Sequence, residues 1–141
     1  MPAGTTSVLV VDDHKVVLSA LVDLVEGTPG LTAWGAAASG EEALALLSAG
    51  DPSGGTDRSY PDLVVSDVQM PGMSGVELAA ALRDRWPGLP CLMVSAHYPG
   101  LYADRAAAAG AVGCVEKGDV RGIIDAIERV AHGASWRAPS P

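Results

Sequence analysis

Polar side chains suited to phosphate or metal chemistry follow four short apolar runs of this sequence. Asp12 and Asp13 follow one run, Asp67 ends another, and Ser95 and Lys117 come at the ends of two more. Because the carboxyl ends of parallel strands meet at one edge of a sheet, we expect these side chains to converge there. Each has a plainer explanation when taken alone: a turn residue or helix cap for an aspartate or serine, and a solvated surface group for the lysine. Their coincidence favours an acidic pocket.

Such a pocket predicts a particular chemistry. Carboxylates within a few ångströms repel one another unless a cation joins them. The strand ends offer only oxygen ligands, with no His or Cys nearby in strand order, and this favours a hard ion, most naturally Mg²⁺. Asp67, at the end of a central strand, is placed to attack phosphorus and form an aspartyl phosphate. Lys117 would neutralise phosphoryl oxygens and the Ser95 hydroxyl would hydrogen-bond one of them, which is most of what phosphoryl transfer requires.

The scaffold predicted for these residues alternates strands and helices. Continuous apolar runs rich in β-branched residues are typical of strands buried on both faces of a parallel sheet. We expect strands at 8–11, 31–36, 63–65, 91–94 and 111–115. Segments with helical spacing of apolar residues follow each run. The alternation predicts an α/β fold, a doubly wound parallel sheet of five strands with five helices on its two faces.

Helix starts are marked by polar residues. Ser39 with Glu42, and Ser74 with Glu77, have the spacing of capping boxes, in which a serine hydroxyl and a glutamate carboxylate each accept a backbone N–H. Asp119 precedes the last apolar stripe and is predicted to cap that helix.

Length and charge limit the function. The chain has 141 residues, 17 acidic against 9 basic side chains and a formal net charge of −8. A free-standing nucleic-acid binder needs a basic face and is therefore disfavoured. No apolar stretch is long enough for a membrane span, and two cysteines provide no disulfide framework. We expect a single cytoplasmic domain with no membrane contact.

The ends of the domain are predicted from composition. Residues 1–6 are expected to be disordered, 7–133 to form the domain, and 134–141 to begin a linker. The stretch 51–61 is rich in Gly, Pro and Ser and is predicted to be a long exposed loop.

Four segments together resemble the receiver domain of bacterial two-component response regulators, most closely the NarL/LuxR-type branch. The resemblance covers nearly the whole chain, roughly residues 7–133. The matching segments are 10–14, 67–75, 94–96 and 110–117. The resemblance implies a flavodoxin-like sheet with strand order 2-1-3-4-5.

Roles in the pocket follow from this resemblance. Asp67 would be the phosphoacceptor. Asp12 and Asp13 would hold Mg²⁺, with Asp67 and the backbone carbonyl of Gln69 completing the protein ligands. Lys117 would pair with the phosphoryl group.

Ser95 would be the switch hydroxyl that moves toward the phosphate. The second switch position is commonly aromatic in the family, but here it is Cys114, and the chain contains no Phe. Swinging of an aromatic ring therefore cannot be the readout. The residue after the lysine is often Pro with a cis bond, whereas here Gly118 predicts a trans bond. The 51–61 loop is also longer than the family norm.

Partners are implied in the same way. The phosphoryl donor would be a histidine kinase or a small acyl phosphate, and phosphorylation would promote a homodimer. Output would be transcription through a LuxR-type DNA-binding domain that is absent from this chain. The domain would not be an enzyme beyond its own phosphorylation and dephosphorylation.

Two alternatives remain open. The chain could be a receiver-like interaction domain that is never phosphorylated, an idea that Cys114 favours and the complete acidic set opposes. It could also be an Mg²⁺-dependent phosphatase with an aspartate nucleophile, but Gln69 occupies the position of the general acid such enzymes need.

The histidines and cysteines have no zinc-site spacing. His14 is expected to be a surface residue at a helix start, although it could reach the rim of the pocket. His97 follows Ser95 and could tune phosphate lifetime. Cys91 and Cys114 are expected to be buried as small apolar residues on neighbouring strands.

Overall fold

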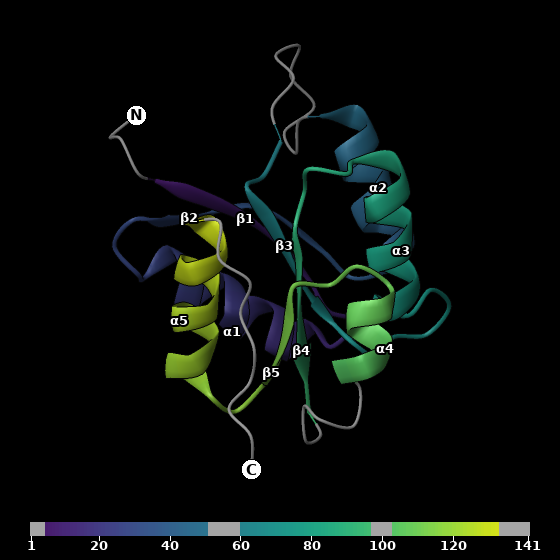
Figure 1. Cartoon of the computed structure of the whole chain (residues 1–141). Helices are drawn as coiled ribbons and strands as arrows, with labels where there is room; N and C mark the ends of the chain where they lie inside the picture. The colour runs from purple at the N-terminus through teal and green to yellow at the C-terminus, as the bar shows by residue number, and fades with distance from the viewer. Residues whose placement is uncertain (1–4, 51–59, 97–102, 133–141) are drawn as a thin grey trace.

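Five strands and five helices alternate along the chain (Figure 1). The computed structural model describes residues 5–50, 60–96 and 103–132. The strands are β1 (Thr6–Val11), β2 (Leu31–Ala37), β3 (Leu63–Asp67), β4 (Cys91–Ser95) and β5 (Gly113–Glu116). The helices are α1 (Lys15–Glu26), α2 (Gly40–Ala49), α3 (Gly75–Arg85), α4 (Ala103–Ala108) and α5 (Val120–Ala131).

All the strands pair in parallel in one sheet, in the order β2-β1-β3-β4-β5. Helices α1 and α5 cover one face of the sheet, and α2, α3 and α4 cover the other (Figure 1). The predicted doubly wound architecture and strand order are confirmed. Strand β3 lies at the centre of the sheet, so Asp67 at its end is at the middle of one sheet edge.

The continuous apolar runs form strands because both faces of the sheet are covered. In β1, Val8 and Val10 pack against α1 and α5, whereas Leu9 and Val11 pack toward α2 and α3. All four are completely buried. A polar residue in the middle of such a strand would meet a hydrophobic layer on either face, so polar groups collect at the strand ends.

The predicted caps form at three helix starts. At α3 the box is complete: Ser74 Oγ accepts from the Glu77 N–H, and Glu77 Oε1 accepts from the Ser74 N–H. At α2 only the serine half is formed, with Ser39 accepting from the Glu42 N–H at 3.0 Å. Asp119 caps α5 by accepting from the backbone three residues on, as predicted.

Some boundaries differ from those predicted. β1 begins at Thr6, one residue before the expected start of the domain, and β2 extends to Ala37. Most of the predicted 51–61 loop lies outside the described residues, as do residues 1–4, His97 and the segment 133–141. Within the described part of the chain, no helix is long and apolar enough to cross a membrane.

Candidate functional site

The parallel register brings the polar strand ends to one level. Val11 pairs with Ser66, Asp67 with Val94, and Ser95 with Glu116. Asp12, Asp67, Ser95 and Lys117 are therefore at or just beyond the carboxyl ends of four adjacent strands. Asp12 and Asp67 are buried, as is Ser95.

Lys117 joins the two buried carboxylates. Its Nζ lies 2.8 Å from Asp12 Oδ2 and 3.1 Å from Asp67 Oδ2, and its side chain is only 14% exposed. The Lys117 backbone N–H donates to the Ser95 carbonyl oxygen at 2.8 Å, which anchors the turn after β5 to the end of β4. Lys117 is thus not the solvated surface group of the plainer interpretation.

Burial and charge act in opposite directions on this group of residues. Burial raises the pKa of Asp67 above its usual value, and the negative charge of Asp12 raises it further. The hydrogen bond and positive charge of Lys117 and the hydrogen bond from the Gln69 N–H lower it, but they do not cancel the rise. For Lys117, burial alone lowers the pKa, but hydrogen bonds to Asp12 and Asp67 and their charges outweigh it and raise the pKa. The lysine therefore stays charged beside the carboxylates.

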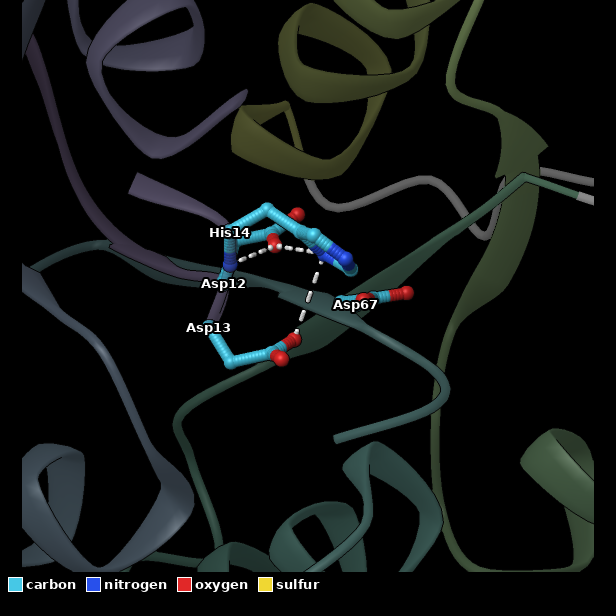
Figure 2. A group of neighbouring side chains, drawn as sticks. All are labelled: Asp12, Asp13, His14 and Asp67. Atoms are coloured by element: carbon cyan, nitrogen blue, oxygen red, sulfur yellow. Dashed lines mark hydrogen bonds and ion pairs between the residues drawn. The ribbon is translucent and has the colours of Figure 1, made fainter. Parts of the chain in front are cut away.

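Asp13 and His14 form the outer side of the same pocket (Figure 2). His14 Nδ1 lies 3.4 Å from Asp12 Oδ1 and 3.5 Å from Asp13 Oδ1. The His14 backbone N–H also donates to Asp12 Oδ1 at 2.9 Å. His14 does stand at the start of α1 and its side chain is 65% exposed. The preferred interpretation as a surface residue was therefore incomplete, because its ring also reaches the pocket rim.

The donor set fits a metal ion. One ligand atom from each of Asp12, Asp13, His14 and Asp67 lies within 4.8 Å of all the others. Asp13 Oδ1 is buried and accepts no hydrogen bond among the described residues. A buried carboxylate oxygen without a donor is unfavourable, and a cation would satisfy it. This pocket can hold a metal ion.

The remaining predicted residues lie around the pocket. The Gln69 N–H donates to Asp67 Oδ1 at 3.4 Å, which places the Gln69 backbone next to the acceptor candidate. Cys114 is buried in β5 opposite Met93 of β4, and Cys91 is buried at the start of β4. Burial of both cysteines agrees with the prediction.

Gly75 was not predicted to matter, yet it determines how closely α3 approaches Asp67. Its N–H donates to the Val68 carbonyl oxygen at 2.8 Å. A Cβ atom at Gly75 would overlap with the carbonyl oxygen of Asp67. Glycine has a low intrinsic helix propensity, yet the sequence places one directly after the predicted Ser74 cap. That mismatch is the signal in the sequence that could have identified it.

Comparison with known proteins agrees with this geometry. Residues 8–128 match the family described as the response regulator receiver domain. The chain is 37% identical over 130 residues to the DNA-binding transcriptional activator DevR/DosR of Mycobacterium tuberculosis, covering 91% of this chain and 55% of that protein. It is 31% identical over 133 residues to the response regulator GacA of Pseudomonas aeruginosa, covering 94% and 58%. The chain thus spans little more than half the length of these relatives.

Solved structures show the same fold. A LuxR-family two-component response regulator from Aurantimonas sp. SI85-9A1 superposes with a TM-score of 0.83 at 30% identity, covering 95% of this chain and 89% of that one. The signal receiver domain of the putative response regulator NarL from Mycobacterium tuberculosis superposes with a TM-score of 0.79 at 29% identity, covering 92% and 98%. This chain therefore belongs to the response regulator receiver domain family, in its NarL/LuxR-type branch.

Proposed function

We propose that this receiver domain accepts a phosphoryl group on Asp67 from the phosphohistidine of a histidine kinase or from a small acyl phosphate. One observation carries the proposal: Asp67 is a buried carboxylate at the end of the central strand, with the Lys117 ammonium 3.1 Å from its Oδ2. The domain would perform no reaction beyond its own phosphorylation and dephosphorylation.

The transfer needs a nucleophile held in place and neutralised charge. An Asp67 carboxylate oxygen attacks the phosphorus, the bond from phosphorus to the donor nitrogen or oxygen breaks, and that electron pair leaves with the donor. The Gln69 N–H and Lys117 hold the Asp67 carboxylate in position. Lys117 then pairs with the phosphoryl oxygens, whose added negative charge it is placed to neutralise.

Mg²⁺ is the ion that we expect the pocket to use. Asp12, Asp13, Asp67 and the backbone carbonyl of Gln69 would hold it. When bound, Mg²⁺ supplies charge neutralisation to the phosphoryl group. The buried Asp13 Oδ1, which accepts no hydrogen bond among the described residues, and the excess of carboxylates over lysine support this assignment.

Switching would begin at Ser95. The residue is buried at the end of β4, and its carbonyl oxygen already accepts from the Lys117 N–H. Movement of the Ser95 hydroxyl toward a phosphoryl oxygen would shift β4 and β5 together. Cys114, buried in β5, would respond as a small apolar group in place of the family's aromatic ring.

The output would be transcription, by way of a LuxR-type DNA-binding domain and a phosphorylation-dependent homodimer. Support comes from the similar protein DevR/DosR, which is named a DNA-binding transcriptional activator and of which the matched region covers only 55%. An acidic chain with a net charge of −8 leaves DNA contact to another domain.

Intact-mass measurement after incubation with acetyl phosphate and Mg²⁺ tests the acceptor. We expect one added phosphoryl group on the wild-type chain and on the control Asp84→Asn, whose side chain is exposed on α3. Asp67→Asn should show none. Equal incorporation in Asp67→Asn would contradict the assignment, and no incorporation in any variant would favour a phosphorylation-independent interaction domain.

A further inference from the structure

The His14 ring lies against the carboxylates of the pocket. An exposed histidine at a helix start is free to point into solvent, but Nδ1 of His14 faces Asp12 Oδ1 and Asp13 Oδ1 at 3.4 and 3.5 Å (Figure 2). The His14 side chain makes no capping hydrogen bond to α1. The ring therefore contacts the carboxylates of the pocket and does not cap the helix.

These distances suit neighbouring ligands of a single ion. Two ligand atoms that are each about 2.1 Å from a metal, at roughly right angles, lie about 3 Å apart. The His14 to aspartate separations are only slightly wider. Asp13 Oδ1, which lies 3.5 Å from His14 Nδ1, is buried and accepts no hydrogen bond among the residues described.

A nitrogen donor changes which metal the pocket prefers. Carboxylate and carbonyl oxygens suit Mg²⁺, whereas imidazole suits first-row transition ions such as Co²⁺, Ni²⁺ and Zn²⁺. Three carboxylates against one lysine provide the negative charge that either kind of ion needs. The imidazole is the one donor in this set that distinguishes between them.

We propose that His14 supplies a nitrogen ligand to the metal in this pocket and raises the affinity of the pocket for first-row transition divalent ions, while leaving its affinity for Mg²⁺ nearly unchanged. This inference rests on the proposed function, because it assigns a further ligand to the same metal site. The ligand class is a borderline divalent cation, bound by three carboxylates and one imidazole.

Calorimetric titration of the metal-stripped full chain with Co²⁺, and separately with Mg²⁺, tests the proposal. In His14→Ala we expect the Co²⁺ affinity to fall about tenfold while the Mg²⁺ affinity stays within about twofold. His132→Ala is the matched control, because His132 is exposed and follows the far end of α5. It should change neither affinity.

A second readout locates the nitrogen directly. Bound Co²⁺ is paramagnetic, so proton NMR of the wild-type chain should show strongly shifted imidazole resonances that are absent from His14→Ala and present in His132→Ala. His14→Gln, which keeps a side chain of similar length, should behave as His14→Ala. His14→Gln replaces His14→Ala in both measurements if thermal unfolding shows that the alanine variant is not folded.

Unchanged Co²⁺ affinity in His14→Ala, or equal losses for Co²⁺ and Mg²⁺, would overturn the inference and leave His14 as an ion-pair partner of the aspartates. Phosphorylation of each variant with Mg²⁺ and acetyl phosphate separates the two proposals. If wild-type Asp67 takes no phosphoryl group, the proposed function fails, whereas the ratio of the two affinities still decides the role of His14.

Discussion

At the residue scale, Lys117 is the counter-charge that allows buried carboxylates to share one pocket. It contacts both Asp12 and Asp67 and is largely shielded from water. Even so, the pKa of Asp67 stays above its usual value, first because the carboxyl is buried and then because Asp12 is close. The fold therefore holds this carboxylate at a cost in stability, as is common for groups that perform chemistry.

The unfavourable burial of the Asp67 carboxylate predicts that Asp67→Asn changes the stability of the chain. Because the pKa of Asp67 is raised in the folded state, its ionisation weakens folding as the pH rises through and above the usual value of 3.8. We expect Asp67→Asn to be more stable than the wild type at pH 7, by about 1 kcal/mol. The gain should shrink as the pH falls and disappear below the usual value of 3.8, where the carboxyl is protonated in both the folded and the unfolded chain.

Thermal unfolding in metal-free buffer at pH 7 and at pH 4 measures this difference. Asp84→Asn, with an exposed side chain, is the control and should unfold like the wild type. A less stable Asp67→Asn variant at pH 7 would show that the Lys117 ion pair outweighs the burial of the carboxylate.

The acids at the strand ends could be predicted because strand direction alone determines which edge they share. The shared location of Asp12, Asp67 and Lys117 could be predicted from the strand pattern and from the rule that parallel strands end at the same sheet edge. The His14 ring could not be placed in this way, because a side chain at a helix start can adopt several rotamers and the sequence does not say which.

At the element scale, the start of α3 determines the geometry beside the acceptor. The complete Ser74 and Glu77 box fixes the first turn, and Gly75 lets that turn contact the backbone at Asp67. The capping box could be predicted from the spacing of Ser74 and Glu77, since it depends on residues that are close in sequence. The close approach of Gly75 to β3 depends on tertiary packing, which local patterns do not report.

We predict that Gly75→Ala destabilises the chain by about 1–3 kcal/mol, because the added methyl group overlaps with the Asp67 carbonyl oxygen. Phosphorylation by acetyl phosphate should also slow, since β3 and α3 must separate at Asp67.

Gly88→Ala is the matched control, because a Cβ atom there meets no other atom within 4 Å. Urea unfolding and the initial rate of phosphoryl incorporation should be unchanged in Gly88→Ala. Equal stability of Gly75→Ala and Gly88→Ala would mean that α3 can shift away from β3 without loss.

At the scale of the whole molecule, two hydrophobic layers enclose the sheet, and the buried polar side chains of the described residues lie at or next to its carboxyl edge. Fold class and the position of the pocket could be predicted from this layering, since buried runs and helical stripes alternate along the chain. The strand order was implied by the resemblance to receiver domains, and the structure has that order. The layers also bury both thiols, Cys91 and Cys114.

Burial raises the pKa of the Cys91 thiol to about 12 and that of the Cys114 thiol to about 11. Thiolate is the reactive form, so neither cysteine should react with a disulfide reagent in the folded chain at pH 8. Both should react once urea unfolds the chain. Rapid reaction of either thiol without urea would show that its strand opens locally.

Dimerisation should depend on the Lys117 side chain, because its Nζ lies beside Asp67 and is placed to pair with the phosphoryl group, while its backbone N–H joins the same residue to the end of β4. Lys117→Ala keeps the backbone link and removes the contact with the phosphoryl site. We expect Lys117→Ala to remain detectably phosphorylated, yet to lose any phosphorylation-dependent increase in mass measured by light scattering. Lys15→Ala is the control, since Lys15 is exposed on α1. An unchanged dimer in Lys117→Ala would contradict this role.

Asp67 is expected to form an acyl phosphate, and this product can be located by chemistry. Borohydride reduction of an aspartyl phosphate converts that residue to homoserine, which tandem mass spectrometry can locate in the sequence. After treatment with acetyl phosphate and Mg²⁺, we predict homoserine at position 67 alone. Homoserine at position 12 or 13, or at no position despite an added phosphoryl mass, would contradict it.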